Sequence, residues 1–191
     1  MKILDLGCGN RKIKAGRKDE VIGIDFKNPI AKPDVSHDLN KLPYPFDDNT
    51  FDFIYASYSL EHLDNPLRVM EEMHRIAKPN ARIVVKVPHY SYGWANILHK
   101  KVFGVHFIEE AFTRNSLERY SDVEFKIINV KLSWIRFPYV HKFSKPVDLL
   151  LRALNHIFSA AANVSPIFCE RVWCYWVGGF EAMEFELKVV K

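Results

Sequence analysis

The segment KILDLGCGN, residues 2–10, joins a short apolar run to a pair of glycines. The run from Lys2 to Leu6 is typical of a buried β-strand. Glycines at its end allow the backbone to approach a ligand closely, with N–H groups that face it. The complete dinucleotide-binding fingerprint has a third glycine about three residues further on, and Lys12 occupies that place. The segment therefore predicts a strand that ends in a ligand-binding turn, although two glycines alone are equally typical of a simple tight turn.

The rest of the first half alternates between predicted strands and a helix. Further apolar runs cover residues 21–26 (VIGIDF), 51–57 (FDFIYAS) and 81–87 (ARIVVKV). Between the last two, apolar residues recur at helical spacing over residues 63–77, with polar residues such as Glu72 on the opposite face, and Pro79 ends the pattern. Nearly continuous apolar strands separated by helices predict an α/β fold whose parallel sheet is covered on both faces.

The second half predicts two more strands around a helical insertion. Residues 125–134 and 183–189 alternate between apolar and polar, with Ile128 on the apolar face of the first. Between them, residues 146–163 fit an amphipathic helix, and Ser165-Pro166 begins a second helix to about residue 177, for which a strand remains an alternative. We therefore predict one domain over residues 1–191, with a helical insertion at about 138–178.

Composition limits the class of protein. Of the 191 residues, 27 are Lys or Arg and 23 are Asp or Glu, and the resulting charge of +4 is milder than in a dedicated nucleic-acid binder. Three cysteines are too few for a disulfide framework or a structural zinc site, so we expect a reducing, cytoplasmic location and no metal ligands. Neither a signal peptide nor a run of about 18 apolar residues is evident, so no transmembrane segment is expected.

Four motifs follow the glycine turn in order along the chain. They are Asp25 after the second apolar run, Asp38-Leu39, the stretch from Pro45 to Asp52, and Leu60-Glu61-His62. Together with residues 5–9, these motifs resemble those of the class I S-adenosylmethionine-dependent methyltransferases, in particular the small-molecule branch that includes the quinone methyltransferases. The resemblance covers roughly residues 3–88. It implies a doubly wound, Rossmann-like, mainly parallel sheet of seven strands with an antiparallel C-terminal strand.

The resemblance also implies which residues bind the cofactor, S-adenosylmethionine. The glycine turn would pack against it, the acid after the second strand would accept the ribose hydroxyls, and the Asp-Leu pair would contact the adenine. The residues in these and neighbouring positions are Asp5, Gly7, Cys8, Gly9, Asp25, Phe26, Asp38, Leu39 and Ser57. The chain departs from the family pattern where only eleven residues separate Gly9 from Val21, so the usual first helix must be short or absent.

Methyl transfer from a sulfonium is an in-line displacement, and alignment of nucleophile, methyl group and sulfur supplies much of the acceleration. A base is needed only where the acceptor must lose a proton, and histidine is the typical choice. The candidates are His89, His106 and His62, although a histidine after a strand is more often a packing residue. We expect a small-molecule or lipid-like acceptor and no nucleic acid. A non-catalytic scaffold that binds S-adenosylmethionine remains an alternative, as does an NAD-dependent oxidoreductase, which the missing third glycine disfavours.

The predicted helix at residues 146–163 has a wide apolar face and a narrow polar stripe. The stripe consists of Asp148, Arg152, His156, Ser159 and Asn163. The apolar face is compatible with a peripheral membrane contact, a lid over the acceptor site or a homodimer interface. The sequence does not separate these three roles.

Overall fold

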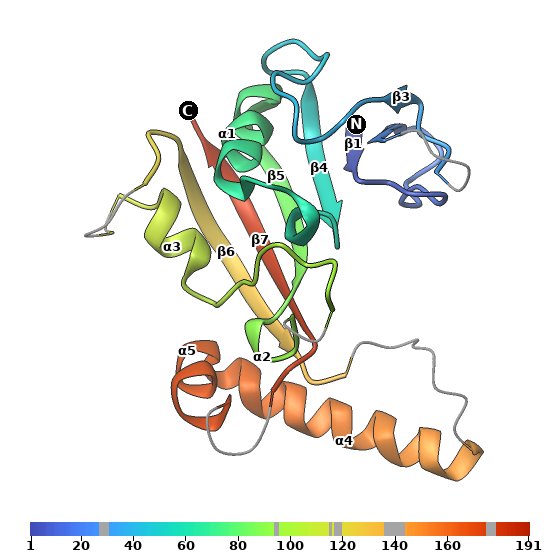
Figure 1. Cartoon of the computed structure of the whole chain (residues 1–191), viewed down its shortest axis with the longest axis vertical. Helices are drawn as coiled ribbons and strands as arrows, with labels where there is room; N and C mark the ends of the chain where they lie inside the picture. Colours follow the sequence, from blue (N-terminus) through green and yellow to red (C-terminus); the bar gives the residue numbers. More distant parts are fainter. Residues whose placement is uncertain (27–30, 94–95, 115, 117–119, 136–143, 175–178) are drawn as a thin grey trace.

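A computed structural model describes residues 1–26, 31–93, 96–114, 116, 120–135, 144–174 and 179–191. In this part of the chain, seven strands form one sheet in the order β3-β2-β1-β4-β5-β7-β6 (Figure 1). The strands are β1 (Lys2–Leu6), β2 (Glu20–Asp25), β3 (Val35–Ser36), β4 (Phe51–Ser57), β5 (Ala77–Pro88), β6 (Glu124–Ser133) and β7 (Ala182–Val190). Neighbours are parallel except where β7 pairs with β5 and β6. The predicted α/β sheet, mainly parallel with an antiparallel C-terminal strand, is therefore confirmed.

The two C-terminal strands differ in how closely they follow their sequence pattern. Along β7, the apolar residues from Met183 to Val189 are buried at alternate positions, as a period of two predicts. Along β6, the register against β7 shifts between Ile127 and Asn129. The prediction that Ile128 faces the core is wrong, because Ile128 is 49% exposed. It is the extra residue of a β-bulge, and such a residue does not follow the alternation of buried and exposed side chains along the strand.

Helix α1 (Pro66–Ile76) packs on the face of the sheet formed by β4 and β5 (Figure 1). The side chain of Asn65 caps its first turn by accepting a hydrogen bond from the Arg68 N–H at 3.3 Å. The prediction that Glu72 lies on the exposed face is wrong, because the loop at residues 43–46 covers it. Its carboxylate accepts hydrogen bonds from the Tyr44 N–H at 2.7 Å and from Arg75 Nη2 at 2.6 Å.

The N-terminal half of the sheet has fewer helices than a doubly wound fold requires. The structure describes residues 7–19 and 37–50 in full, and neither segment contains a helix. The first of these segments joins β1 to β2, so the expectation that the first helix is short or absent is confirmed. The edge at β1 where the sequence predicts ligand binding therefore consists of loop backbone without a helix N-terminus behind it.

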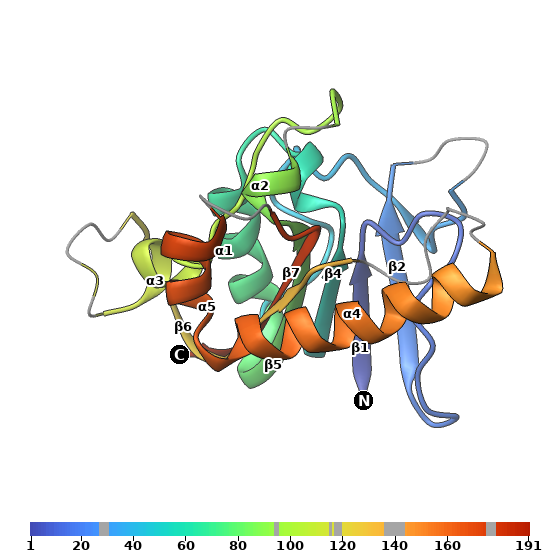
Figure 2. The same ribbon diagram turned by 90° about the horizontal axis from the view of Figure 1, so that it is seen from below.

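Between β6 and β7, the chain forms a helical layer at the carboxyl ends of the parallel strands (Figures 1 and 2). This layer consists of α4 (Lys145–Val164), α5 (Pro166–Phe168) and the π-helix η2 (Cys169–Trp173). Both predicted helices are present as far as residue 174, so the strand alternative is excluded there. The predicted ends of the insertion at 138 and 178 lie outside the described residues. The shorter elements are η1 (Leu60–His62), α2 (Tyr90–Gly93) and α3 (Phe107–Phe112).

Helix α4 turns part of its polar stripe toward the protein and most of its apolar face away from it. Asn163 forms two hydrogen bonds with the Leu132 backbone, both at 2.8 Å. Ser159 Oγ accepts from the Trp134 N–H at 3.1 Å, and Asn155 Oδ1 accepts from the Ile135 N–H at 2.8 Å. These bonds partner backbone groups that the edge strand β6 would otherwise leave open. No helix in the described ranges is long and apolar enough to cross a membrane.

Candidate cofactor and acceptor site

The turn after β1 brings two glycines next to the carboxyl end of β2. Gly7 and Gly9 have φ values of +76° and +56°, which residues with a Cβ rarely adopt. A Cβ on Gly7 would lie 2.5 Å from the Cβ of Ser59, whereas a Cβ on Gly9 would meet no atom within 4 Å. Gly7 is therefore required for close packing, and the backbone at Gly9 is open to a ligand.

Asp25 lies at the end of β2, beside this turn. Its Oδ2 accepts a hydrogen bond from the Gly9 N–H at 2.7 Å, and its Oδ1 accepts from the Phe26 N–H at 2.6 Å. Each carboxylate oxygen has two lone pairs, so both oxygens retain the capacity to accept ribose hydroxyls. The Phe26 side chain beside it is 62% exposed. The residues present thus fit a ribose-containing cofactor whose hydroxyls lie against Asp25.

Two residues predicted to contact the cofactor lie beneath the turn. Asp5 is buried, and its Oδ2 accepts from the Ile13 N–H at 2.6 Å, which holds the loop that replaces the first helix. Burial raises the pKa of the Asp5 carboxyl above its ordinary value. Burial also raises the pKa of the Cys8 thiol to about 11, so Cys8 is not a thiolate nucleophile at neutral pH. The Cys8 side chain packs closely against Gly23, because a Cβ on Gly23 would lie 2.7 Å from the Cys8 sulfur. The space at position 8 therefore suits a small side chain.

The Asp-Leu pair follows β3 along the same edge. The His37 N–H donates to the Asp25 carbonyl at 2.9 Å, which brings the pair close to the ribose-binding position. Asp38 Oδ1 accepts from the Asn40 N–H at 3.1 Å. Leu39 is buried, and its carbonyl accepts from the Tyr44 hydroxyl at 3.0 Å. An acid and an apolar side chain therefore lie where the resemblance places the adenine.

The end of β4 completes this edge. Ser57 is half-buried and pairs in register with Lys86 of β5. Ser59 was missed from the sequence, although its Oγ donates to the Leu6 carbonyl at 3.2 Å and its Cβ faces Gly7. The signal that could have identified Ser59 is the need for a small residue opposite a glycine with positive φ. The structure thus gathers the predicted cofactor residues along the carboxyl ends of β1 to β4.

The three predicted catalytic histidines do not lie together. His62 is in η1, directly after the residue that contacts the glycine turn, and its Nδ1 lies 3.1 Å from the Leu98 carbonyl. His89 is fully buried, with Nδ1 2.7 Å from Ser91 Oγ and Nε2 3.1 Å from Glu170 Oε2. Because both of its ring nitrogens have protein partners, the His89 geometry favours holding η2 against β5 over contact with an acceptor.

His106 lies beside the same carboxylate as His89. Its Nδ1 is 3.2 Å from Glu109 Oε2, and its Nε2 is buried without a hydrogen-bond partner in the described structure. Glu170 also accepts from the Val105 N–H at 2.7 Å. Burial opposes ionisation of Glu170, but the hydrogen bonds from His89 and Val105 hold the pKa of its carboxyl below the ordinary value. His89 and the Val105 N–H thus hold Glu170 of η2 in place, and His106 directly follows Val105.

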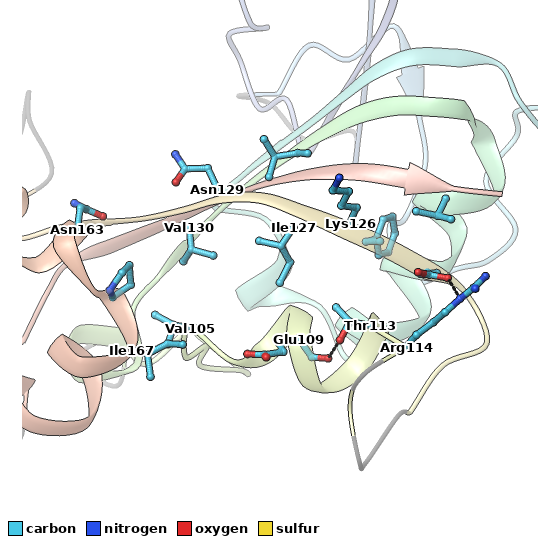
Figure 3. Close-up of a pocket in the computed structure, with 15 residues that line it drawn as sticks. Val105, Glu109, Thr113, Arg114, Lys126, Ile127, Asn129, Val130, Asn163 and Ile167 are labelled. Carbon is cyan, nitrogen blue, oxygen red and sulfur yellow. Dashed lines mark hydrogen bonds and ion pairs between the residues drawn. The ribbon is translucent and has the colours of Figure 1, made fainter.

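Cavities of different character surround the sheet. A groove of about 750 Å³ follows the outer edge of β6, lined by residues such as Val105, Lys126 and Ile167 (Figure 3). Because β6 and the β1 turn are separated by three strands of the sheet, this groove is not part of the cofactor edge. A cavity of about 310 Å³ lies next to that edge and is lined by polar residues that include Tyr58 and Lys86.

Comparison with known proteins identifies this arrangement. A family described as "Methyltransferase domain" matches residues 4–85. "Sterol 4-C-methyltransferase strm-1" of Caenorhabditis elegans is 33% identical over 136 residues, which cover 70% of this chain and 37% of that protein. "Demethylmenaquinone methyltransferase" of Lysinibacillus sphaericus (strain C3-41) is 30% identical over 100 residues, or 44% of this chain and 42% of that protein.

Solved structures show the same fold. A "SAM dependent methyltransferase from Archaeoglobus fulgidus" aligns with a TM-score of 0.53 and 18% identity, covering 98% of this chain and 85% of that one. The chain spans about two fifths of the length of the curated relatives named above. The matched region contains the glycine turn, Asp25 and the Leu60–His62 motif. Residues 4–85 of the chain therefore match a methyltransferase domain, and the chain has the fold of the S-adenosylmethionine-dependent methyltransferases.

Proposed function

We propose that the protein transfers a methyl group from S-adenosylmethionine to a small, lipid-like acceptor. The observation that carries this proposal is the Asp25 carboxylate next to the open backbone at Gly9. The names of the curated relatives, which specify a sterol and demethylmenaquinone, support an apolar acceptor. Transfer requires the acceptor nucleophile, the methyl carbon and the sulfur in line. The acceptor attacks the methyl carbon, the carbon–sulfur bond breaks toward sulfur, and S-adenosylhomocysteine is released.

Among the predicted catalytic histidines, we assign His62 to the acceptor side of the site. It follows β4 in η1, next to Ser59 and hence next to the glycine turn. We assign His89 and His106 positioning roles, because His89 lies within hydrogen-bond distance of Glu170 and His106 directly follows Val105, whose N–H donates to the same carboxylate. All of these residues lie in one methyltransferase domain, which we propose extends over residues 1–191.

Calorimetry with S-adenosylmethionine tests the cofactor site. Hydrogen bonds to a charged group contribute about 1.5–3 kcal/mol, so Asp25→Ala is expected to weaken binding by about 10- to 100-fold. Asp47→Ala is the matched control, because this exposed acid lies in the loop before β4 and away from the turn. Equal affinities of Asp25→Ala and the unmodified protein would contradict the ribose assignment. Tight binding of NAD without binding of S-adenosylmethionine would contradict the function.

The second candidate is a protein that binds S-adenosylmethionine without catalysis. It is favoured by the absence of a helix in residues 7–19, which leaves the methionine end of the site less enclosed. Incubation with S-adenosylmethionine and a total lipid extract distinguishes the two functions. Catalysis releases S-adenosylhomocysteine, and the Asp25→Ala variant releases less. Cofactor binding without any release of S-adenosylhomocysteine would favour the second candidate.

We further propose that the insertion contacts an anionic lipid surface. Large apolar side chains of this layer are exposed, among them Leu149, Leu150, Ile157, Val164 and Phe168. Lys145, Arg152 and Arg171 are exposed on the same helices. Of these three cations, Arg152 is paired with Asp148 at 2.7 Å, and the other carboxylate of these helices, Glu170, is buried. An apolar face with surrounding cations complements anionic headgroups above an acyl layer.

Sedimentation with vesicles tests this contact. The protein is expected to pellet with phosphatidylglycerol vesicles, less with phosphatidylcholine alone, and much less when Phe168 or Leu149 is changed to Glu. Ile128→Glu is the matched control, because Ile128 is an exposed apolar residue of strand β6, outside the helices that carry the proposed contact. A protein that stays in the supernatant, or a homodimer that Phe168→Glu dissociates, would refute the contact.

The three cysteines form no disulfide, and we propose a cytoplasmic location on this basis.

A further inference from the structure

Three side chains with metal-binding atoms meet at the carboxyl end of β4. They are Glu61 and His62 of η1, and His99 of the loop that follows α2. One carboxylate oxygen and one nitrogen from each imidazole all lie within 4.8 Å of one another. Ligand atoms about 2.0–2.2 Å from a zinc ion are about 3–4 Å apart, so small side-chain rotations complete the geometry.

Backbone hydrogen bonds hold the two contributing segments together. The Glu61 carbonyl accepts from the Lys100 N–H at 2.8 Å and from the Lys101 N–H at 3.2 Å. Lys100 Nζ also pairs with Asp64 at 2.7 Å. The rings of His62 and His99 have centroids 5.2 Å apart. His99 is therefore fixed above η1, although 36 residues separate it from His62 along the chain.

The His62 imidazole has a backbone partner on one of its two ring nitrogens. Its Nδ1 lies 3.1 Å from the Leu98 carbonyl, and a carbonyl partner requires that this nitrogen carry the proton. Nε2 then has its lone pair available. A backbone carbonyl that fixes the tautomer of a ligating imidazole is a common feature of metal sites. Glu61 is only 1% exposed, so its carboxylate lies in the protein interior next to His62.

We propose that Glu61, His62 and His99 bind a divalent transition-metal ion of the zinc type. One carboxylate and two imidazoles form the ligand set of catalytic zinc sites and of open non-haem iron sites. Three protein ligands leave at least one position for an exogenous oxygen. Oxygen-only cations such as Mg²⁺ are disfavoured by the two nitrogen ligands.

The metal site lies next to the predicted cofactor edge, and this position suggests a role for the ion in methyl transfer. That role rests on the proposed function. Ser59 abuts Gly7, and η1 begins at the next residue. A hydroxyl of the acceptor occupies the open position, and the positive charge favours loss of its proton to water. The oxygen then forms a bond to the methyl carbon while the carbon–sulfur bond breaks toward sulfur. The acceptor class is thus a compound that carries a hydroxyl group and is methylated on that oxygen.

Metal binding is measured with tag-free protein, by Zn²⁺ calorimetry and by the visible absorption of bound Co²⁺. One ion per chain is expected. Loss of a residue that only hydrogen-bonds to a metal ligand weakens metal binding by about 10- to 100-fold, so loss of the ligand itself in His99→Ala is expected to weaken it by at least about 100-fold. His156→Ala is the matched control, because His156 is exposed on α4. Glu61→Gln provides a second test, with folding verified by circular dichroism. Absence of stoichiometric binding, or equal affinity in His99→Ala, would overturn the site.

Calorimetry with S-adenosylmethionine on the same variants separates this inference from the proposed function. His99→Ala is expected to retain cofactor affinity, whereas Asp25→Ala is expected to retain Zn²⁺ affinity. Metal binding without cofactor binding would refute the function and leave the site intact. Cofactor binding without metal binding would refute the site and leave the function intact.

Discussion

Replacement of Gly7 by Ala is expected to destabilise the protein more than replacement of Gly9 by Ala. Both residues have positive φ values, at +76° and +56°, and a Cβ in this region costs about 1–2 kcal/mol. Only at Gly7 does the new Cβ also meet an atom, the Ser59 Cβ at 2.5 Å. Overpacking of this kind costs about 1–3 kcal/mol more. The expected losses are therefore about 1–2 kcal/mol for Gly9→Ala and about 2–5 kcal/mol for Gly7→Ala.

Thermal unfolding followed by circular dichroism measures both losses. One kcal/mol lowers Tm by about 2–4 °C in a chain of this size, so Gly9→Ala is expected to lower Tm by about 2–8 °C and Gly7→Ala by about 4–20 °C. A double-mutant cycle with Ser59→Gly isolates the contact, because Gly7→Ala should cost less when Ser59 has no side chain. Equal losses at the two glycines, or a cycle without coupling, would refute the close packing of β1 against η1.

Three further predictions concern other parts of the molecule. Asn163→Ala removes the bonds to Leu132, so amide exchange in β6 is expected to accelerate while exchange in β1 stays unchanged; acceleration in both strands would contradict a local role. Because the pKa of Glu170 is held below its ordinary value of 4.5, folding releases a proton from this group. Stability is therefore lost as pH falls from about 4.5 through the folded pKa, and Glu170→Gln is expected to flatten this decline, which urea titrations from pH 3 to 6 measure. The Cys8 thiol, whose pKa is raised to about 11, is expected to react with iodoacetamide at pH 8 only after unfolding; rapid reaction in the native state would contradict its burial.

Local pattern predicted much of the fold. The apolar runs ending at Leu6, Phe26 and Ser57 became β1, β2 and β4, because burial on both faces of a parallel sheet leaves a continuous apolar signature. The alternation from Met183 to Val189 became β7, because a strand with one buried face has apolar residues at every second position. The prediction failed at Ile128, because a bulge depends on how two strands pair and not on either strand alone.

Long-range contacts produced the features that the sequence did not reveal. Glu72 is buried because a loop far from it in sequence donates the Tyr44 N–H to its carboxylate. The polar stripe of α4 partly faces inward because Asn163 bonds to the edge of β6 and Asn155 and Ser159 bond to the two residues after it. Periodicity shows that a helix has two faces, but not which of them meets the protein.

The sequence alone determined the cofactor edge, because its residues follow the ends of successive strands, and parallel strands bring their carboxyl ends to one side of a sheet. Asp25 and the glycine turn needed no further information to be placed together. Only the tertiary structure separated the roles of the histidines, placing His89 in a buried network and His62 against His99. The physical reason is distance along the chain, since the partners of these side chains come from loops and helices whose positions are set by packing against the completed sheet.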